Sequence, residues 1–185
     1  MPNLKQIACK LRSADGSEIA EAAMVLPLVF MLLLGIIWFG RAFNIYSTIQ
    51  QAAQQGAIVA ARDSCATCTG GNAPPSVATA DNAIFAVMQA DNLLPGQIQL
   101  PTNPPNCGPG QPCTACPPPS PPAGACSSTA NIYVCQNVQL NPTATPPQCG
   151  TVVSFQYPFQ FNLPFTSLNM QQIILSAQAA SRMEN

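Results

Sequence analysis

The chain has 185 residues, a formal net charge of −1, 7% charged residues and no histidine. These values exclude Ser-His-Asp and Cys-His catalysis, histidine metal ligands and the basic surface that nucleic acid requires. The length allows one modest domain beside an apolar segment, and so little charge fits a protein beside a membrane or inside an assembly.

A short polar leader, residues 1–16, carries three of the six basic residues and precedes an uncharged stretch over 22–40. That stretch is long enough to cross a bilayer, which takes about 20 residues. Glu18 and Glu21 come directly before it, and a carboxylate at the edge of a span indicates function. Glu18, following Ser17, also suits an ordinary helix start. A secretory signal peptide is the alternative, but no small-residue cleavage site follows Trp38.

One long helix is predicted over 17–62, kinked at Pro27 and amphipathic beyond Arg41. Its apolar face is rich in small residues, so either another helix or the protein's own domain could pack closely against it. The residues of this face are Ala42, Tyr46, Ile49, Ala53, Gly56 and Ala60.

A second helix is expected between Pro74-Pro75 and Pro95-Gly96, with Asp81 and Asp91 exposed. Its apolar face consists of Val77, Ala80, Ala83, Ile84, Val87 and Met88, with Leu94 as a further candidate. Ile98 and Leu100 then alternate as in a short strand. Residues 101–126 hold ten of the 20 prolines and predict a loop with polyproline character.

The last third predicts an antiparallel sheet, because apolar residues recur at every second position. One pair of short runs contains Ile132, Val134, Val138 and Leu140, and another contains Val152, Val153, Phe155, Tyr157, Phe159 and Phe161. The final segment, from about residue 170 to 182, fits a strand or a helix, and a strand is favoured.

Nine cysteines are a high count, and all but Cys9 follow the apolar stretch. A basic leader stays in the cytoplasm by the positive-inside rule, so the other eight face an oxidising compartment and suffice for four disulfides. A four-thiolate zinc site or a redox-active C-x-x-C pair is the less favoured alternative. The disulfide candidates are Cys65, Cys68, Cys107, Cys113, Cys116, Cys126, Cys135 and Cys149.

The residues from Gly16 onward resemble the TadE-like family, minor pilins or pseudopilins of tight-adherence (Flp-type) pilus systems. Its pattern is matched by Gly16, Glu21, Ala23, Pro27, Gly35 and Phe39-Gly40-Arg41. The resemblance implies cleavage after Gly16 by a prepilin peptidase, with Ser17 as the new N-terminus and Glu21 as its fifth residue. Buried in a helix bundle, that carboxylate would pair with a neighbouring N-terminal amine. Ala22 stands where processed members often carry an aromatic residue, so an anchored chain with its leader intact is the alternative.

The sequence therefore predicts an α+β protein: a transmembrane helix continuing into a small, disulfide-stapled, pilin-like domain over 63–185 with a short antiparallel sheet. Its expected place is the bacterial inner membrane, with the N-terminus cytoplasmic and the domain extracytoplasmic or incorporated in a filament. The expected partners are other pilins and pilus assembly proteins, without catalytic residues, metal, cofactor, nucleic acid or small-molecule substrate. The alternatives are an anchored binding module that uses the 101–126 loop, and a membrane-tethered thiol oxidoreductase.

Overall fold

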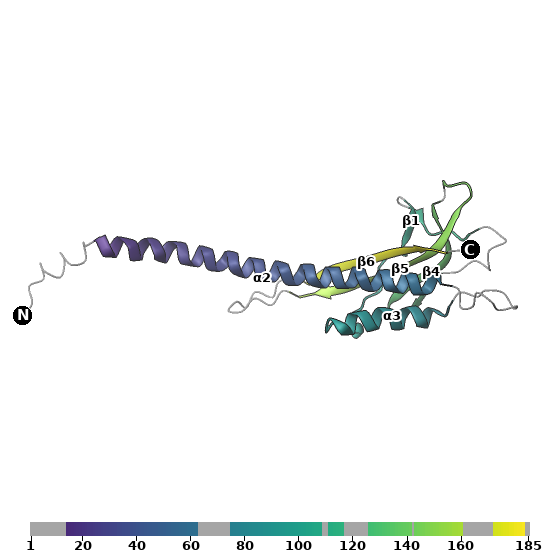
Figure 1. Cartoon of the computed structure of the whole chain (residues 1–185), viewed down its shortest axis with the longest axis horizontal. Helices are drawn as coiled ribbons and strands as arrows, with labels where there is room; N and C mark the ends of the chain where they lie inside the picture. The colour runs from purple at the N-terminus through teal and green to yellow at the C-terminus, as the bar shows by residue number, and fades with distance from the viewer. Residues whose placement is uncertain are drawn as a thin grey trace, which may run out of the picture. The chain divides into compact units, whose positions relative to one another are not determined.

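The computed structural model describes residues 14–62, 75–108, 111–116, 126–141, 143–160 and 172–183. The chain divides into two compact units, Met1–Ala42 and Phe43–Asn185, and helix α2 contributes residues to both (Figure 1). The helical elements are α2 (Ala14–Ala61), α3 (Val77–Ala90) and the 3-10 turn η1 (Pro95–Gln97). The strands are β1 (Asn106–Gly108), β2 (Gln111–Pro112), β3 (Cys126–Thr129), β4 (Ile132–Asn141), β5 (Gln148–Phe159) and β6 (Ile173–Arg182).

The first unit consists, where it is described, of the N-terminal part of α2. This part starts at Ala14, three residues before the predicted start, and contains Pro27 within the helix. Its apolar side chains point away from the protein: Met24, Leu26 and Met31 are each more than 70% exposed. A helix that is apolar all round and covered by no protein atoms is suited to lipid rather than to water.

The second unit has its main core between two helices and one face of a sheet. The second part of α2 and the inner face of α3 contribute Ile49, Ile84 and Met88, and the strands contribute Val153 and Phe155, all fully buried. Gly56 allows the two helices to approach each other, because a Cβ at this position would lie only 2.6 Å from Cγ1 of Ile84. The small-residue face of α2 therefore packs on the protein's own domain from Ile49 to Ala60, whereas Tyr46, predicted on the same face, is 44% exposed.

The sheet has four antiparallel strands in the order β3-β4-β5-β6. A two-residue turn, Ala130-Asn131, joins β3 to β4, and both of its residues have the positive φ angles that such hairpins require. Strand β4 is a single strand with a register shift between Cys135 and Val138, at the positive-φ residue Asn137. The final segment forms β6, as favoured from the sequence, and pairs with β5 from Phe159↔Ile173 to Gly150↔Arg182.

The opposite face of the sheet is also covered, by the described part of the Pro- and Cys-rich segment. A small cluster of Cys135, Val138 and Val152 is buried there, with Cys107, Cys113, Cys126 and Leu140 against it. The backbone of this segment bonds to β4, since Gln139 N–H donates to Thr114 O and Cys116 N–H donates to Asn137 O. These residues thus form a second covering layer, not only a loop.

Two sequence predictions are wrong in this unit. Asp81, expected at the surface, is only 5% exposed, because it lies four residues after Val77 and three before Ile84 on the inner face of α3. Ile98 and Leu100 do not belong to a strand: η1 precedes them, and only Gln99 between them forms a bridge, with Gln156. Asp91 is exposed, as expected.

Candidate functional site

The predicted processing site lies on a helical backbone. Gly16 and Ser17 belong to the first turn of α2, which begins at Ala14. The first N–H groups of a helix have no partner inside the helix, so the first turn is the easiest to unwind. A protease that reads this site would have to unwind that turn in order to bind the chain in an extended form.

Glu21 is exposed and stands among apolar side chains that are also exposed. Ile19 and Met24, on either side of it, are 71% and 78% exposed. A carboxylate in such surroundings is costly to place in lipid, and membrane proteins retain one where it pairs with another group. This exposed position is compatible with the predicted pairing of Glu21 with another group.

A stretch of α2 is long and apolar enough to cross a membrane, and none of it is buried in the protein. Near its end the Arg41 guanidinium carbon lies 5.9 Å from the centroid of the Trp38 ring. This distance allows a cation–π contact, and both residue types are common at the membrane–water interface. The uncharged residues 22–40 thus end in a pair that suits the lipid boundary.

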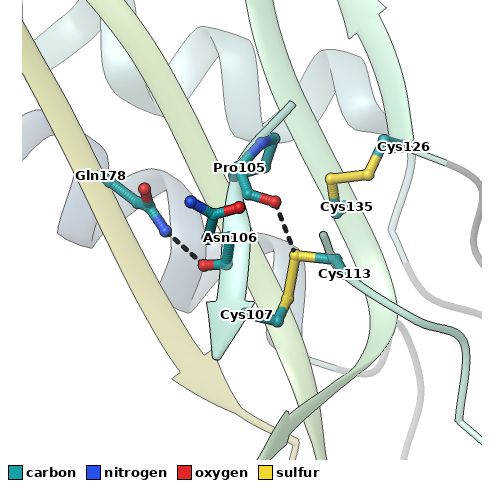
Figure 2. The surroundings of a disulfide bond; sticks show 7 residues. All are labelled: Pro105, Asn106, Cys107, Cys113, Cys126, Cys135 and Gln178. Carbon is teal, nitrogen blue, oxygen red and sulfur yellow. Dashed lines mark hydrogen bonds between the residues drawn. A yellow bond between two sulfur atoms is a disulfide. The ribbon is translucent and has the colours of Figure 1, made fainter. Parts of the chain in front are cut away.

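Three disulfides join cysteines of the described part of the second unit: Cys107–Cys113, Cys116–Cys149 and Cys126–Cys135. Figure 2 shows two of them, together with the hydrogen bond from Gln178 Nε2 to Asn106 O, 2.7 Å, that ties β1 to β6. Cys113 Sγ also lies 3.1 Å from Pro105 O. A disulfide sulfur has no proton, so this is a close sulfur–oxygen contact and not a hydrogen bond.

The disulfides separate the two members of one C-x-x-C motif. Cys113 is bonded to Cys107 and Cys116 to Cys149, so these two thiols do not form a pair with each other. A redox-active C-x-x-C and a zinc site both need the two cysteines to act together as thiolates. In this arrangement neither chemistry is open to Cys113 and Cys116. Cys65 and Cys68 lie outside the described residues.

Asp81 is the buried carboxylic acid in the described part of the second unit, 5% exposed. Its Oδ2 accepts a hydrogen bond from the Thr129 hydroxyl at 2.5 Å, while its buried Oδ1 has no hydrogen-bond partner among the described residues. Burial raises the pKa of the Asp81 carboxyl, and the Thr129 hydrogen bond lowers it by less. This contact between α3 and the β3–β4 hairpin was not predicted from the sequence.

An exposed apolar helix followed by a small disulfide-bonded α+β domain is the architecture of a single-span membrane protein. Residues 16–57 match the family model described as TadE-like protein, which confirms the resemblance seen in the sequence. The match includes Gly16, Glu21, Pro27 and the part of α2 that packs on α3. Comparisons with curated proteins and with solved structures give no match.

Proposed function

We propose that this protein is a minor pilin or an assembly factor of a tight-adherence (Flp-type) pilus or a related secretion apparatus. It acts structurally, through its membrane helix, and catalyses no reaction. The observation that carries the proposal is the TadE-like match over residues 16–57, which supports association with a Tad pilus system. The helix anchors the chain in the bacterial inner membrane, with the leader cytoplasmic and the disulfide-bonded domain extracytoplasmic.

In this proposal Glu21 directs the helix to its neighbours. The Glu21 carboxylate stays out of water only if a cation compensates the cost of desolvation, which is several kcal/mol for each buried ion. The N-terminal amine of a neighbouring subunit, freed by cleavage after Gly16, is a suitable cation. The helix faces around Glu21 are exposed and apolar, as packing against other membrane helices requires.

The proposal is tested by removing the carboxylate. We expect the Glu21→Ala variant to insert in the membrane at the wild-type level. It should no longer be incorporated into the pilus or support pilus assembly. Glu18→Ala is the matched control, because it removes a carboxylate three residues earlier and keeps Glu21. The measurements are piliation by electron microscopy and the amount of each variant in the membrane fraction. Normal piliation by the Glu21→Ala variant would contradict the role of Glu21.

Processing is tested on the same protein by intact mass and N-terminal sequencing without reduction. A start at Ser17 with eight hydrogens missing would indicate prepilin-type cleavage and four disulfides. An N-terminus near Met1, with the leader still present, would instead favour an anchored TadE-like protein that is not cleaved.

A further inference from the structure

The second unit leaves seven large apolar side chains exposed among its described residues, and their distribution is uneven. The five most exposed are Phe43 (64%), Leu94 (62%), Ile174 (51%), Ile173 (47%) and Tyr46 (44%). The other two, Leu100 and Ile58, are 37% and 36% exposed. Side chains that gather on one surface, rather than scatter singly, indicate a contact surface.

Contacts within the second unit show how α2 runs along the sheet. Gln50 Nε2 donates to Ser176 O, and ten residues later Ala60 O accepts from the Thr151 hydroxyl. Thr151 pairs with Ser181 in the sheet. Residues 50 to 60 of α2 therefore follow β6 from Ser176 to Ser181, in the same direction. Ile173 and Ile174, which precede Ser176 in β6, lie level with the start of this helical part.

The end of α3 reaches the same place. The Thr48 hydroxyl donates to Asp91 Oδ2 at 2.5 Å, directly after α3 ends at Ala90. Leu94 N–H donates to the Tyr157 hydroxyl at 3.4 Å, and the backbone of Tyr157 pairs with that of Leu175. Leu94 thus lies at the end of the unit where Phe43, Tyr46, Ile173 and Ile174 lie. These five residues are called the Phe43 end.

Charge has a different distribution in the second unit. Arg182 pairs with Gly150, next to Thr151, and Arg62 follows Ala60 by two residues, so both arginines stand at the opposite end. Asp91 is the charged residue described at the Phe43 end, and its carboxylate accepts the Thr48 hydrogen bond. Ile58 lies toward the arginines, whereas Leu100 follows Gln99, whose bridge partner Gln156 is next to Tyr157, so the less exposed Leu100 adjoins the Phe43 end.

The chain joins the Phe43 end directly to the apolar stretch. The uncharged residues 22–40 end three residues before Phe43. Three residues span at most about 10 Å, so Phe43 itself lies within that distance of the surface of a bilayer that residues 22–40 cross. Isoleucine and leucine gain by leaving water there, and tyrosine is favoured at the headgroup level, where its ring is apolar and its hydroxyl is wet.

We propose that the Phe43 end is a lipid-binding surface that rests in the interfacial region of the bilayer crossed by the protein's own helix. The occupant of this surface is the membrane, continuous with the lipid around residues 22–40. The inference depends on the membrane-spanning part of the proposed function and not on a role in a pilus. By this contact the bilayer would hold the domain in a fixed orientation.

The test uses the full chain in phosphatidylcholine vesicles whose acyl chains carry bromine near the headgroup, because bromine quenches tryptophan fluorescence at contact. Trp38, the single tryptophan, is changed to Phe, and a new tryptophan is introduced by Leu94→Trp or by Ile174→Trp. The matched control is Ile58→Trp, an exposed apolar position at the other end. We expect at least a twofold loss of fluorescence at positions 94 and 174, relative to vesicles without bromine, and no loss at position 58.

Equal quenching at the three positions would overturn the lipid contact. Acrylamide, a quencher dissolved in water, tests whether protein covers the surface instead of lipid. If position 94 is protected from acrylamide but not quenched by bromine, protein occupies the surface, and the proposal is overturned. The wild-type protein tests the membrane span separately from the lipid contact of the Phe43 end, because its Trp38 lies in the span. Quenching of Trp38 alone would refute only this inference, whereas no quenching of Trp38 would refute the span and the inference together.

Discussion

The buried carboxyl of Asp81 makes a contribution of known sign to the pH dependence of the domain's stability. The pKa of Asp81 is raised in the folded protein above its ordinary value of 3.8, chiefly by burial. The folded state therefore holds this proton more tightly than the unfolded chain does. The stability that protonation provides is fully present below the unfolded pKa and is lost as the pH rises through the folded pKa.

We therefore expect the thermal midpoint of the wild-type domain to fall as the pH rises from below 4 towards neutrality. Asp81→Asn keeps an oxygen to accept the Thr129 hydroxyl but cannot ionise, so its midpoint should change less over the same range. Asp91→Asn is the comparison variant, because it removes the other carboxylate described in this unit, which accepts the Thr48 hydroxyl as Asp81 accepts that of Thr129. Near-ultraviolet circular dichroism in detergent micelles measures all three proteins. Parallel curves for Asp81→Asn and wild type would rule out this role for Asp81.

The position of Asp81 could have been inferred from helical spacing, but its residue type argued the other way. Aspartate is almost never fully buried unless it is paired. The partner that makes burial possible, Thr129, is 48 residues away in the chain and belongs to a hairpin that the sequence pattern did not predict. Contacts of this kind depend on tertiary structure and leave no local signal.

At the scale of elements, the patterns that repeat over many residues predicted the structure reliably. The small-residue face of α2, the apolar face of α3 and the alternating residues Val153, Phe155 and Tyr157 of β5 each belong to the main core, so their periods gave the element types, although the other face of β5 is buried as well. The short strands β1, β2 and β3 were not predicted, because each is held by disulfides or by a neighbouring strand and has little periodicity of its own. The resemblance to the TadE-like family covered the helix and not the sheet, so it could not supply them.

The contact between α2 and α3 predicts the effect of one added methyl group. Gly56→Ala gains about 1 kcal/mol of helix propensity. However, the new Cβ would lie 2.6 Å from Ile84 Cγ1 and 2.7 Å from Cδ1, and Ile84 is fully buried. Overpacking of a core costs about 1–3 kcal/mol, so we expect a net loss of roughly 1 kcal/mol of unfolding free energy.

Urea unfolding of the full chain in micelles measures that loss. Gln55→Ala is the control, since Gln55 is exposed on the same helix and its substitution should leave the midpoint within about 0.5 kcal/mol of wild type. A Gly56→Ala variant that is more stable than wild type would mean that Ile84 moves aside, and that the helices are not held at this distance.

For the whole molecule, composition predicted the class better than it predicted the structural role of each part. Low charge, the cysteine count and the apolar stretch indicated a membrane-anchored, disulfide-bonded protein. The Pro- and Cys-rich segment was predicted to be a loop, because proline content reports missing backbone donors and not what the segment covers. Its described part covers one face of the sheet, so removal of residues 101–126 would expose Cys135, Val138 and Val152 as well as delete a candidate binding loop.

The disulfides that hold this segment are expected to contribute unequally to stability. Cys116–Cys149 joins residues 33 apart and ties the segment to β5, whereas Cys107–Cys113 closes a separation of 6. By loop-closure entropy the first contributes about 4 kcal/mol and the second about 2 kcal/mol. The double variant Cys116→Ala/Cys149→Ala should therefore have a lower unfolding free energy than Cys107→Ala/Cys113→Ala, by roughly 1–2 kcal/mol, and unfold at a lower urea concentration. Without reductant, both double variants should remain more stable than wild-type protein in dithiothreitol, because reduction breaks every disulfide of the wild type. Equal midpoints for the two double variants would show that the segment is held by its backbone bonds to β4 and not by its covalent link to β5. An unchanged midpoint of the wild type under reduction would show that the disulfides are not the main support of the domain.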